Sequence, residues 1–476
     1  MSDVTKEGNK PTKFVKSKKR KKKKLSPKSK NQPVPVDRQA PFNIDELFFS
    51  VTDPKSVITF ANETFIRISG YSENELMGEL HKIIRHPDMP RTIFKVFWDY
   101  LLQNKPVAAY VKNLAKDGSY YWVMALAFPC KSGYLYVRLK PESSNFSKVT
   151  ELYKNLLKFE KKQETSSNKR KPLETTENYL LEMLAEMGFS SYDEFMLYSL
   201  EKEMHNREEA LHRLNKHTKT TLQTPTHYRQ LQSSLVTMLE KAEALNQMHN
   251  TLIEHSDYLL KLARSILLLS VNAQVGSAKL DQKHLFLSVV AEKLGEQSFN
   301  GEKKLIQMQE AVSKLNGLIK SLNFNIIISK LQVEMNISFL EELAENKKTN
   351  SHFAISPDEA VELLKEGYMP KLTGIKNEIN ELPHHLRKLR TGVYEIGKFL
   401  QTLRFIHVTG KIEVARLDDH NSSFATTFNE LIQQVEYAEE KMVELAEFIE
   451  DNEKIGKIFA DNKMSLEDFL FEDGRQ

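Results

Sequence analysis

Cysteine is nearly absent from this chain of 476 residues, in which Cys130 is the only one. A single cysteine excludes an internal disulfide framework and any metal site with several cysteine ligands. It is typical of a protein in a reducing cytoplasm, and we expect that location. Cys130 ends a predicted strand, where a small buried side chain is a better interpretation than a redox sensor.

Long apolar runs are absent as well. The most apolar stretch, Tyr258 to Ala273, is interrupted by Lys261 and Arg264 and is too short to span a bilayer. The N-terminus lacks the apolar core of a secretory signal. The net charge is only +4, so no global field points to nucleic acid. We therefore expect a soluble protein.

Catalytic signatures are missing too. The sequence contains no Walker loop, no histidine-kinase module with an Asn- and Gly-rich ATP site, and no motif for cyclic-nucleotide synthesis. The histidines of its C-terminal half do not form the i, i+4 pairs that are typical of metal ligands. We predict a protein without enzyme activity, without a metal and without a small-molecule substrate.

The first feature that is present is a basic tail. Residues 1–40 are poor in apolar side chains and dense in lysine, most of all between Lys18 and Lys24. Such a composition favours disorder. Its charge favours attachment to an anionic membrane, nucleic acid or an acidic protein, while a solvated tail without a partner explains it equally well.

A small α+β domain is predicted over residues 41–145, a normal domain size. Five segments have the apolar and aromatic pattern of strands, namely residues 48–51, 57–60, 107–111, 120–128 and 134–139. Asn62 and Gly70 are residues that begin and end a short helix, and Ser72 with Glu75 has capping-box spacing. We expect an antiparallel sheet with helices on one face, which forms a cup with an aromatic interior.

The segment Arg85-His86-Pro87-Asp88-Met89-Pro90 is the most specific part of this domain. Its prolines fix the backbone around three polar side chains. Arg85 and His86 can bind a carbonyl, a phosphate or a carboxylate. Asp88 precedes an amphipathic run, Arg91 to Leu102, and is placed to cap its helix. A rigid surface turn is the plainer interpretation of the same residues.

Several motifs together resemble a PAS domain, in particular the flavin-binding PAS domain of bacterial aerotaxis receptors. They are Ile58-Thr59-Phe60-Ala61-Asn62-Glu63-Thr64-Phe65, Ser69-Gly70-Tyr71, Glu75-Leu76-Met77-Gly78, Arg85 to Pro90, Val111-Lys112-Asn113, and Asp117-Gly118 through Tyr121-Trp122-Val123. The resemblance covers about residues 45–141 and implies a noncovalently bound FAD whose redox state is the signal.

The same resemblance implies that Arg85, His86, Asp88 and Asn113 affect flavin binding. Three further residues of the matching segments complete our set of candidate cofactor-binding residues: Asn62, Tyr121 and Trp122. A tryptophan that is common in the family is Val107 here, which removes one candidate flavin contact. A haem bound through His81 or His86 is the less favoured alternative.

After the α+β domain the sequence predicts helices to its end. We divide it into a helical linker region, residues 146–227, a first hairpin, 228–346, and a second, divergent hairpin, 347–476. Apolar residues recur there at spacings of three and four, which predicts a long antiparallel helical bundle. Pro357, Gly367, Pro370 and Pro383 predict that the third long helix is interrupted and its hairpin kinked and shorter.

The two hairpins contain an internal repeat. Residues 270–282 align without a gap with residues 407–419, so that Asn272 faces Thr409 at an offset of 137 residues. The first copy resembles the signalling tip of methyl-accepting chemotaxis receptors. The segments that carry this resemblance are Leu269 through Val275, Ala278-Lys279 and Ser288 through Leu294. In that family the tip contacts a histidine kinase and its coupling protein.

The candidate signalling-tip residues are Asn272, Val275, Ala278, Lys279, Glu413 and Arg416. Because the chain has two copies of the hairpin, it can build a four-helix bundle alone, although self-association is the alternative. We interpret the chain as a redox or energy-state sensor that uses FAD and relays its state through this bundle to protein partners. A non-catalytic adaptor, whose sensor-like domain is empty or dimerises, is the second interpretation.

Overall fold

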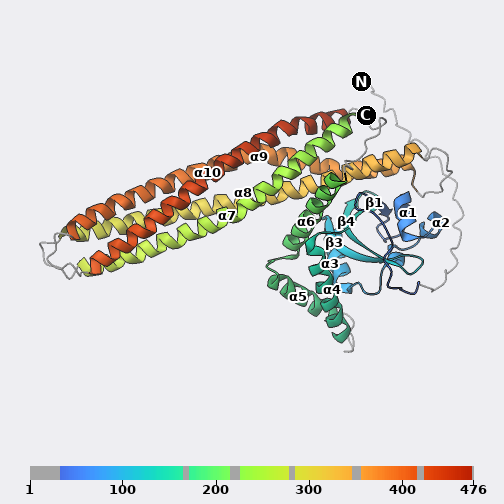
Figure 1. Cartoon of the computed structure of the whole chain (residues 1–476), viewed down its shortest axis with the longest axis horizontal. Coiled ribbons are helices and arrows are strands. Elements are labelled where there is room, and N and C mark those ends of the chain that lie inside the picture. The colour runs from blue at the N-terminus through green and yellow to red at the C-terminus, as the bar shows by residue number, and fades with distance from the viewer. Residues whose placement is uncertain are drawn as a thin grey trace, which may run out of the picture.

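The computed structural model describes residues 33–163, 171–214, 226–277, 285–345, 355–414 and 423–473. It has two parts, a five-stranded sheet with its helices and a long helical bundle that extends away from the sheet (Figure 1). This confirms the predicted fold class, an α+β domain followed by an antiparallel bundle of two hairpins. Within the described residues, no helix is both long and apolar enough to cross a membrane.

The sheet is antiparallel throughout, in the order β2-β1-β5-β4-β3. Its strands are β1 Phe48–Thr52, β2 Ile58–Ala61, β3 Val107–Leu114, β4 Tyr120–Cys130 and β5 Gly133–Leu139. The Asp117-Gly118 turn joins β3 to β4, and Gly118 has a φ of 85°, which glycine adopts without strain. Ala125 of β4 pairs with Arg138 of β5, so these two residues lie on the same face. We name this the inner face.

Short helices lie between β2 and β3, and α3 covers the inner face. They are α1 Glu63–Ser69, α2 Glu73–Leu76, the 3₁₀ turn η1 His81–Ile84 and α3 Arg91–Leu102. Asn62 caps α1 by accepting a hydrogen bond from the Phe65 amide, and Gly70 ends it with a φ of 71°. Ser72 and Glu75 form the capping box of α2. Local capping signals therefore predicted these boundaries correctly.

The start of α3 is different from the prediction. Asp88 does not cap this helix, and the N-cap position is Pro90, which makes no side-chain cap. The carboxylate of Glu160, from helix α4 (Ser144–Gln163), accepts hydrogen bonds from the Arg91 and Thr92 amides at 2.9 and 2.7 Å. A buried carboxylate from a distant helix thus replaces the local cap, because it satisfies two free amides at once and lies at the positive end of the helix dipole.

Helices α4, α5 (Lys171–Glu186) and α6 (Tyr192–Arg213) follow the sheet, and α4 and α6 pack on its outer face. Phe146 of α4 stacks on Tyr110 with ring centroids 5.7 Å apart. Glu203 of α6 is buried, accepts a hydrogen bond from the Tyr110 hydroxyl at 2.8 Å, and also accepts one from the Ser143 amide at the start of α4. The outer face of the sheet is therefore held to α4 by ring stacking and to α6 by a hydrogen bond.

Four long helices form the bundle: α7 Thr226–Ser277, α8 Leu285–Glu345, α9 Pro357–Val414 and α10 Ser423–Asp473. Helix α7 packs against α8 and α10, and α9 packs against the same two, so α7 and α9 are diagonal in the bundle. A single chain thus supplies all four helices. The ends of α7 and α9 and the starts of α8 and α10 lie together at the end far from the sheet (Figure 1).

The predicted interruption of the third long helix is wrong. Helix α9 runs without a break through Pro370 and Pro383, and its 58 residues match the 52 of α7 and 61 of α8. Both prolines are exposed. A proline leaves the carbonyl four residues earlier without its helical donor. At these exposed positions helix α9 tolerates both residues.

Helix α8 also contacts the sheet. Phe339 lies edge-on against Phe49 of β1 and Phe60 of β2, at 5.0 and 5.5 Å between ring centroids. One turn later, Glu342 accepts hydrogen bonds from the Asn62 side chain and the Glu63 amide, at 3.1 and 2.6 Å. The buried apolar residues of the sheet, of α4 to α6 and of this end of α8 and α9 form one continuous core.

The chain before β1 is partly bonded to the sheet. The Val36 amide donates to the Gly118 carbonyl. The Ala40 amide donates to the Tyr120 carbonyl, and the Tyr120 amide donates to the Arg38 carbonyl. Arg38 forms an ion pair with Asp117 at 2.6 Å. Residues 36–40, which we assigned to the basic tail, therefore extend the sheet domain, while residues 1–32 lie outside the described part of the chain.

Candidate functional site

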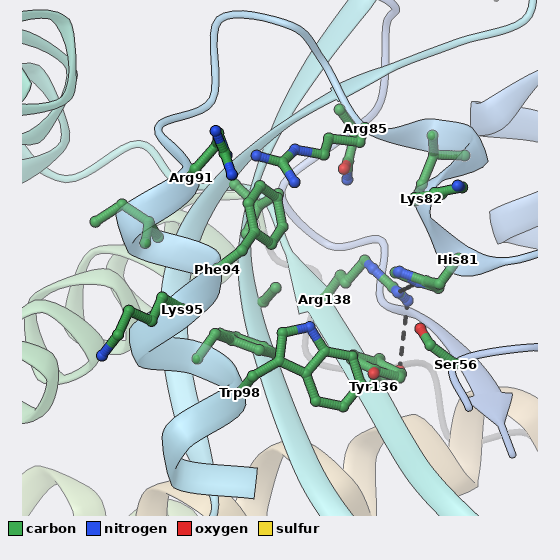
Figure 2. A pocket seen from close by; sticks show the side chains of 16 residues that line it. Ser56, His81, Lys82, Arg85, Arg91, Phe94, Lys95, Trp98, Tyr136 and Arg138 are labelled. Carbon is green, nitrogen blue, oxygen red and sulfur yellow. Dashed lines mark hydrogen bonds between the residues drawn. The ribbon is translucent and has the colours of Figure 1, made fainter. Parts of the chain in front are cut away.

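A cavity of about 300 Å³ lies between α3 and the inner face of the sheet. Figure 2 shows Arg85 and Arg91 together near Phe94, and Arg138 beside His81. The lining residues come from η1, α3 and four strands or turns of the sheet domain. They are Ser56, His81, Lys82, Ile84, Arg85, Arg91, Ile93, Phe94, Lys95, Phe97, Trp98, Val111, Asn113, Ala125, Tyr136 and Arg138.

The lining combines aromatic rings with positive charge. Phe94, Phe97, Trp98 and Tyr136 supply the rings. None of the lining residues is a carboxylate. Six of them are basic, namely His81, Lys82, Arg85, Arg91, Lys95 and Arg138. Rings of this kind bind a flat aromatic molecule by stacking, and an excess of cations attracts an anion. The cavity therefore fits an aromatic ligand that carries negative charge.

Arg138 is the most unusual of these cations. It is 1% exposed, and no ion pair joins it to a carboxylate within the described part of the chain. Its Nη2 donates to the Ser50 hydroxyl at 3.0 Å and lies 2.5 Å from Nε2 of His81. Burial lowers the pKa of the guanidinium to about 10, which still leaves it charged at neutral pH. A buried charge without a counter-ion is costly unless a ligand supplies one.

Sequence reasoning missed Arg138. The signal that could have found it is a charge within the otherwise apolar strand segment Tyr134-Leu135-Tyr136-Val137-Arg138-Leu139. Strand alternation places Arg138 on the same face as Tyr136, the aromatic side of the cup. A charge at an inward position of a buried strand is rare without a function.

His81 lies next to Arg138 and is held by stacking. Its ring is parallel to that of Tyr136, with centroids 4.6 Å apart. Burial, together with the neighbouring Arg138, lowers the pKa of His81 well below its ordinary value. The imidazole is therefore neutral at pH 7, so its Nε2 can accept a hydrogen bond from Arg138.

Arg85 and Asn113, two of the candidate cofactor-binding residues, also line this cavity. The Arg85 guanidinium lies 4.0 Å above the centre of the Phe94 ring, and burial lowers its pKa. An isolated backbone bridge joins Arg85 to Asn113, so the two residues hold η1 against β3. Asn113 is buried and fixed in position.

A second cavity of about 280 Å³ shares Arg85 and Arg91 with the first. Its other lining residues are His86, Pro87, Met89, Leu157, Glu160 and Lys161. His86 is buried, and its Nδ1 accepts a hydrogen bond from the Asp88 amide at 3.1 Å. Burial and the nearby Lys112 lower the pKa of His86. This predicted residue thus borders the second cavity rather than the first.

Asp88 borders neither cavity. Its side chain is 56% exposed and pairs with Lys112 of β3 at 2.9 Å. Although partial burial raises the pKa of Asp88, the hydrogen bond and charge of Lys112 lower it overall. The carboxylate therefore fastens the Arg85–Pro90 segment to β3, and any effect on a ligand acts through that segment.

The three other candidate residues lie elsewhere. Asn62 caps α1 and reaches Glu342 of the bundle. Tyr121 is on the inner face but packs among Phe42 and Phe48, and burial raises its pKa. Trp122 points to the outer face, where it contacts Phe146 of α4. None of the three is in the lining of either cavity.

Within the described ranges there is no group of three or more His, Cys, Asp or Glu residues that could hold a metal ion. Cys130 is half-buried at the end of β4, with its sulfur 3.6 Å from the Ser132 hydroxyl. Val107 is buried at the start of β3 and is not in the lining of the cavity.

Most of the predicted signalling tip lies outside the residues and side chains that the structure describes. Ala278, Lys279 and Arg416 lie outside the described residues, and the side chains of Asn272 and Glu413 do as well. Val275 is described and exposed. It belongs to a row of apolar side chains on α7, formed by Leu268, Val271 and Val275, which are 68, 47 and 56% exposed.

The same row occurs on α9. Phe405, Val408 and Ile412 are 73, 50 and 52% exposed, and each is 137 residues after its counterpart on α7. Spacings of three and four place each set on one side of its helix. We name them the α7 stripe and the α9 stripe. Because α7 and α9 are diagonal, the stripes face opposite sides of the bundle. Unpaired apolar rows of this kind typically mark contact surfaces.

Comparisons with known proteins agree with this architecture. Residues 58–134 match the family model described as the PAS fold. The aerotaxis receptor of Escherichia coli (strain K12) is 38% identical over 131 residues, which cover 26% of this chain and 26% of that protein. The nitrogen fixation regulatory protein of Klebsiella pneumoniae is 36% identical over 74 residues, covering 16% and 15% of the two chains.

A solved light-oxygen-voltage domain is 21% identical and covers 22% of this chain and 82% of that chain, with a TM-score of 0.20. The chain spans about a quarter of the length of the aerotaxis receptor and about 15% of the length of the nitrogen fixation regulatory protein. The sheet domain is thus a PAS domain of the aerotaxis-receptor type, and a long helical region follows it.

Proposed function

We propose that this chain is a redox sensor that binds FAD in the cavity of its PAS domain and relays the flavin's state through the helical region to protein partners. The observation that carries the proposal is Arg138, a buried cation without a carboxylate partner in the described ranges, in a cavity lined by rings and cations. A flavin nucleotide is aromatic and anionic, so its ring system can stack on the aromatic side chains and its negative charge can pair with the cations.

The residues present fit this group. Trp98, Tyr136 and Phe94 offer aromatic surfaces, and Arg85 and Arg91 are the cations at the side shared with the second cavity. Bound FAD would supply reversible uptake of electrons and protons. Arg138 would stabilise negative charge on the ligand, and the neutral His81 would keep the guanidinium in place. Haem is less well supported, because His81 is committed to Arg138 and Tyr136 and His86 is absent from the first cavity.

The relay starts one residue from the ligand cavity. Ser50 of β1 accepts a hydrogen bond from Arg138 on the inner face, and its neighbour Phe49 packs against Phe339 of α8 on the outer face. A change of charge in the cavity that moves Arg138 therefore acts on β1 and, through it, on the bundle. A ligand shifts such an equilibrium by its different interaction free energies with the two arrangements.

The output would be a protein contact at the far end of the bundle. The α7 and α9 stripes recur at the repeat offset in the region that resembles a chemoreceptor tip. A chemotaxis histidine kinase or its coupling protein is the partner that this resemblance favours. Self-association through the stripes is the competing possibility, and the basic tail adds a contact with an anionic membrane or with nucleic acid.

An absorption spectrum of the purified full chain tests the sensor proposal. Flavin bands close to one per chain are expected, together with FAD in the supernatant after heat release. A protein that stays colourless after incubation with FAD would refute the proposal and leave the adaptor function, which the modest volume of the first cavity favours. A Soret band would replace flavin by haem.

A further inference from the structure

The two cavities are neighbours, and the wall between them consists of cations. Arg85 and Arg91 belong to the lining of both, and Figure 2 shows these two side chains on the same side of the first cavity. The second cavity is bounded on its other side by α4, through Leu157, Glu160 and Lys161. A ligand that extends past Arg85 and Arg91 therefore reaches the first helix after the sheet.

Volume favours an extended ligand. Small-molecule pockets span about 300–1,000 Å³. The first cavity, at about 300 Å³, is at the lower limit of that range and suits a mononucleotide-sized ring system at most. A dinucleotide needs further room for its adenylate half, and the second cavity adds about 280 Å³ at the shared wall.

Charge favours a diphosphate at this wall. Arg85, Arg91 and Lys161 are cations, while Glu160 is the one carboxylate in the lining of the second cavity. Both Glu160 oxygens already accept hydrogen bonds from the Arg91 and Thr92 amides at the start of α3, and the helix dipole offsets its charge. Even with Glu160 counted in full against the three cations, an excess of two positive charges is left, which matches the two negative charges of a diphosphate bridge.

We propose that the second cavity binds the adenylate half of the FAD dinucleotide, with Lys161 as a phosphate contact and Leu157 as an apolar one. This inference rests on the proposed function, and it adds that α4 itself is part of the ligand site. FAD would then order the end of α4, whereas FMN and riboflavin, which lack the adenylate half, would not. Helix α4, which leads out of the PAS domain, would then contact the dinucleotide directly.

The test compares the affinities of FAD, FMN and riboflavin for the full chain, freed of bound flavin, by quenching of flavin fluorescence. We expect the affinity to fall in that order. Lys161→Glu should weaken FAD binding roughly tenfold, because it removes a charge-assisted hydrogen bond, and should leave riboflavin binding unchanged. Lys158→Glu is the matched control, since Lys158 is an exposed lysine on the same helix outside both linings.

Hydrogen exchange gives a second readout. FAD, but not FMN, should slow exchange in residues 157–163 of the wild-type chain, and Lys161→Glu should abolish the difference. Equal affinities for the three flavins, with Lys161→Glu and Lys158→Glu both silent, would overturn the inference and leave the flavin proposal intact. Binding of none of the three flavins would overturn both.

Discussion

Nη1 of Arg207 donates to a carboxylate oxygen of Glu334 at 2.7 Å, and the two side chains are 2 and 3% exposed. This pair joins α6 to α8. Lys330 adds a second cation to Glu334, and Nε of Arg207 also donates to the Ile44 carbonyl before β1. A buried ionic cluster therefore ties together the chain entering the PAS domain, the linker helix and the bundle.

Replacing one member of this cluster should be costly. Glu334→Gln leaves Arg207 and Lys330 short of a negative charge in a buried place, and should lower the free energy of unfolding by about 3 kcal/mol. The midpoint of urea unfolding, followed by circular dichroism, measures this. Glu151→Gln is the control, because Glu151 pairs with Lys154 at the exposed surface and should contribute less than about 1 kcal/mol. Equal losses in the two variants would contradict the prediction.

Arg138→Met should have opposite effects on stability and on binding. Without ligand, removal of a buried cation that lacks a carboxylate partner in the described residues should leave the free energy of unfolding unchanged or raise it by about 1–2 kcal/mol. Flavin affinity should fall more than tenfold, because the anionic ligand loses its buried partner. Thermal unfolding and flavin titration measure the two.

Arg67→Met is the control for this pair of measurements, since Arg67 is exposed and pairs with Glu46 away from the cavity. It should change neither quantity by more than about 0.5 kcal/mol. A strongly destabilised Arg138→Met variant that still bound flavin normally would show that Arg138 is a structural residue.

Phe339→Ala should weaken the contact between the PAS domain and the bundle. Loss of a buried ring typically lowers the free energy of unfolding by about 3–5 kcal/mol. Because Phe339 touches Phe49 and Phe60, hydrogen exchange in residues 48–61 should also become faster. Phe299→Ala, on the same helix but 64% exposed, is the matched control. Unchanged exchange in β1 and β2 would argue against a relay through this ring.

Acid should destabilise the PAS domain through His81. Burial and Arg138 keep the folded-state pKa of this imidazole well below its ordinary value of 6.5. As the pH falls below 6.5, the unfolded chain binds the proton and the folded chain does not, so stability decreases by up to about 1.4 kcal/mol per pH unit. The stabilising contribution is complete above pH 6.5 and is lost in acid.

Thermal unfolding at pH 7.5 and 5.5 measures this dependence. His81→Gln should reduce the fall in melting temperature without abolishing it, because burial also lowers the pKa of His86. His205→Gln, at an exposed histidine of α6, should leave the fall unchanged. An identical fall in all three proteins would exclude His81 as its source.

The two stripes should act as equivalent partner contacts. Val271→Asp and Val408→Asp each place a charge in one apolar row, and each should halve the amount of chemotaxis coupling protein bound at saturation. The double variant should bind none. Because these side chains are exposed, the melting temperature should stay the same. Val443→Asp, at an exposed valine of α10 outside both stripes, is the control.

Size-exclusion chromatography with light scattering separates this outcome from self-association. If the stripes join copies of this chain, the wild type should increase in mass with concentration and the double variant should not. Full binding by the double variant would show that the partner contact, if it exists, lies elsewhere.

Local signals in the sequence predicted much of the PAS domain. Asn62, Gly70 and the pair Ser72 and Glu75 act within a few residues of themselves, so their neighbours decide the outcome. The cap of α3 failed as a prediction because Glu160, 69 residues after Arg91 and 68 after Thr92, competes with Asp88 only in the folded chain. No local pattern contains that information.

The structure brings together only some of the residues that the sequence named as candidates, for a similar reason. Arg85 and Asn113 do meet in one cavity, while Trp122 is turned away by the alternation of β4, which a motif match does not consider. Arg138 is distant from the most specific motif and joins it only through the pairing of β5 with β1 and β4. The proposed role of Arg138 as a ligand contact depends on its surroundings, because the lining of the cavity contains no carboxylate.

The arrangement of the four long helices on one polypeptide has a consequence for stoichiometry. A bundle made from two chains dissociates on dilution, whereas α7 to α10 remain joined at any protein concentration. Within the described residues each bundle also has a single PAS domain, so in the proposed relay one binding event in one cavity would reach both sides of the bundle together. The two stripes are encoded separately as well, and a substitution in one leaves its counterpart untouched.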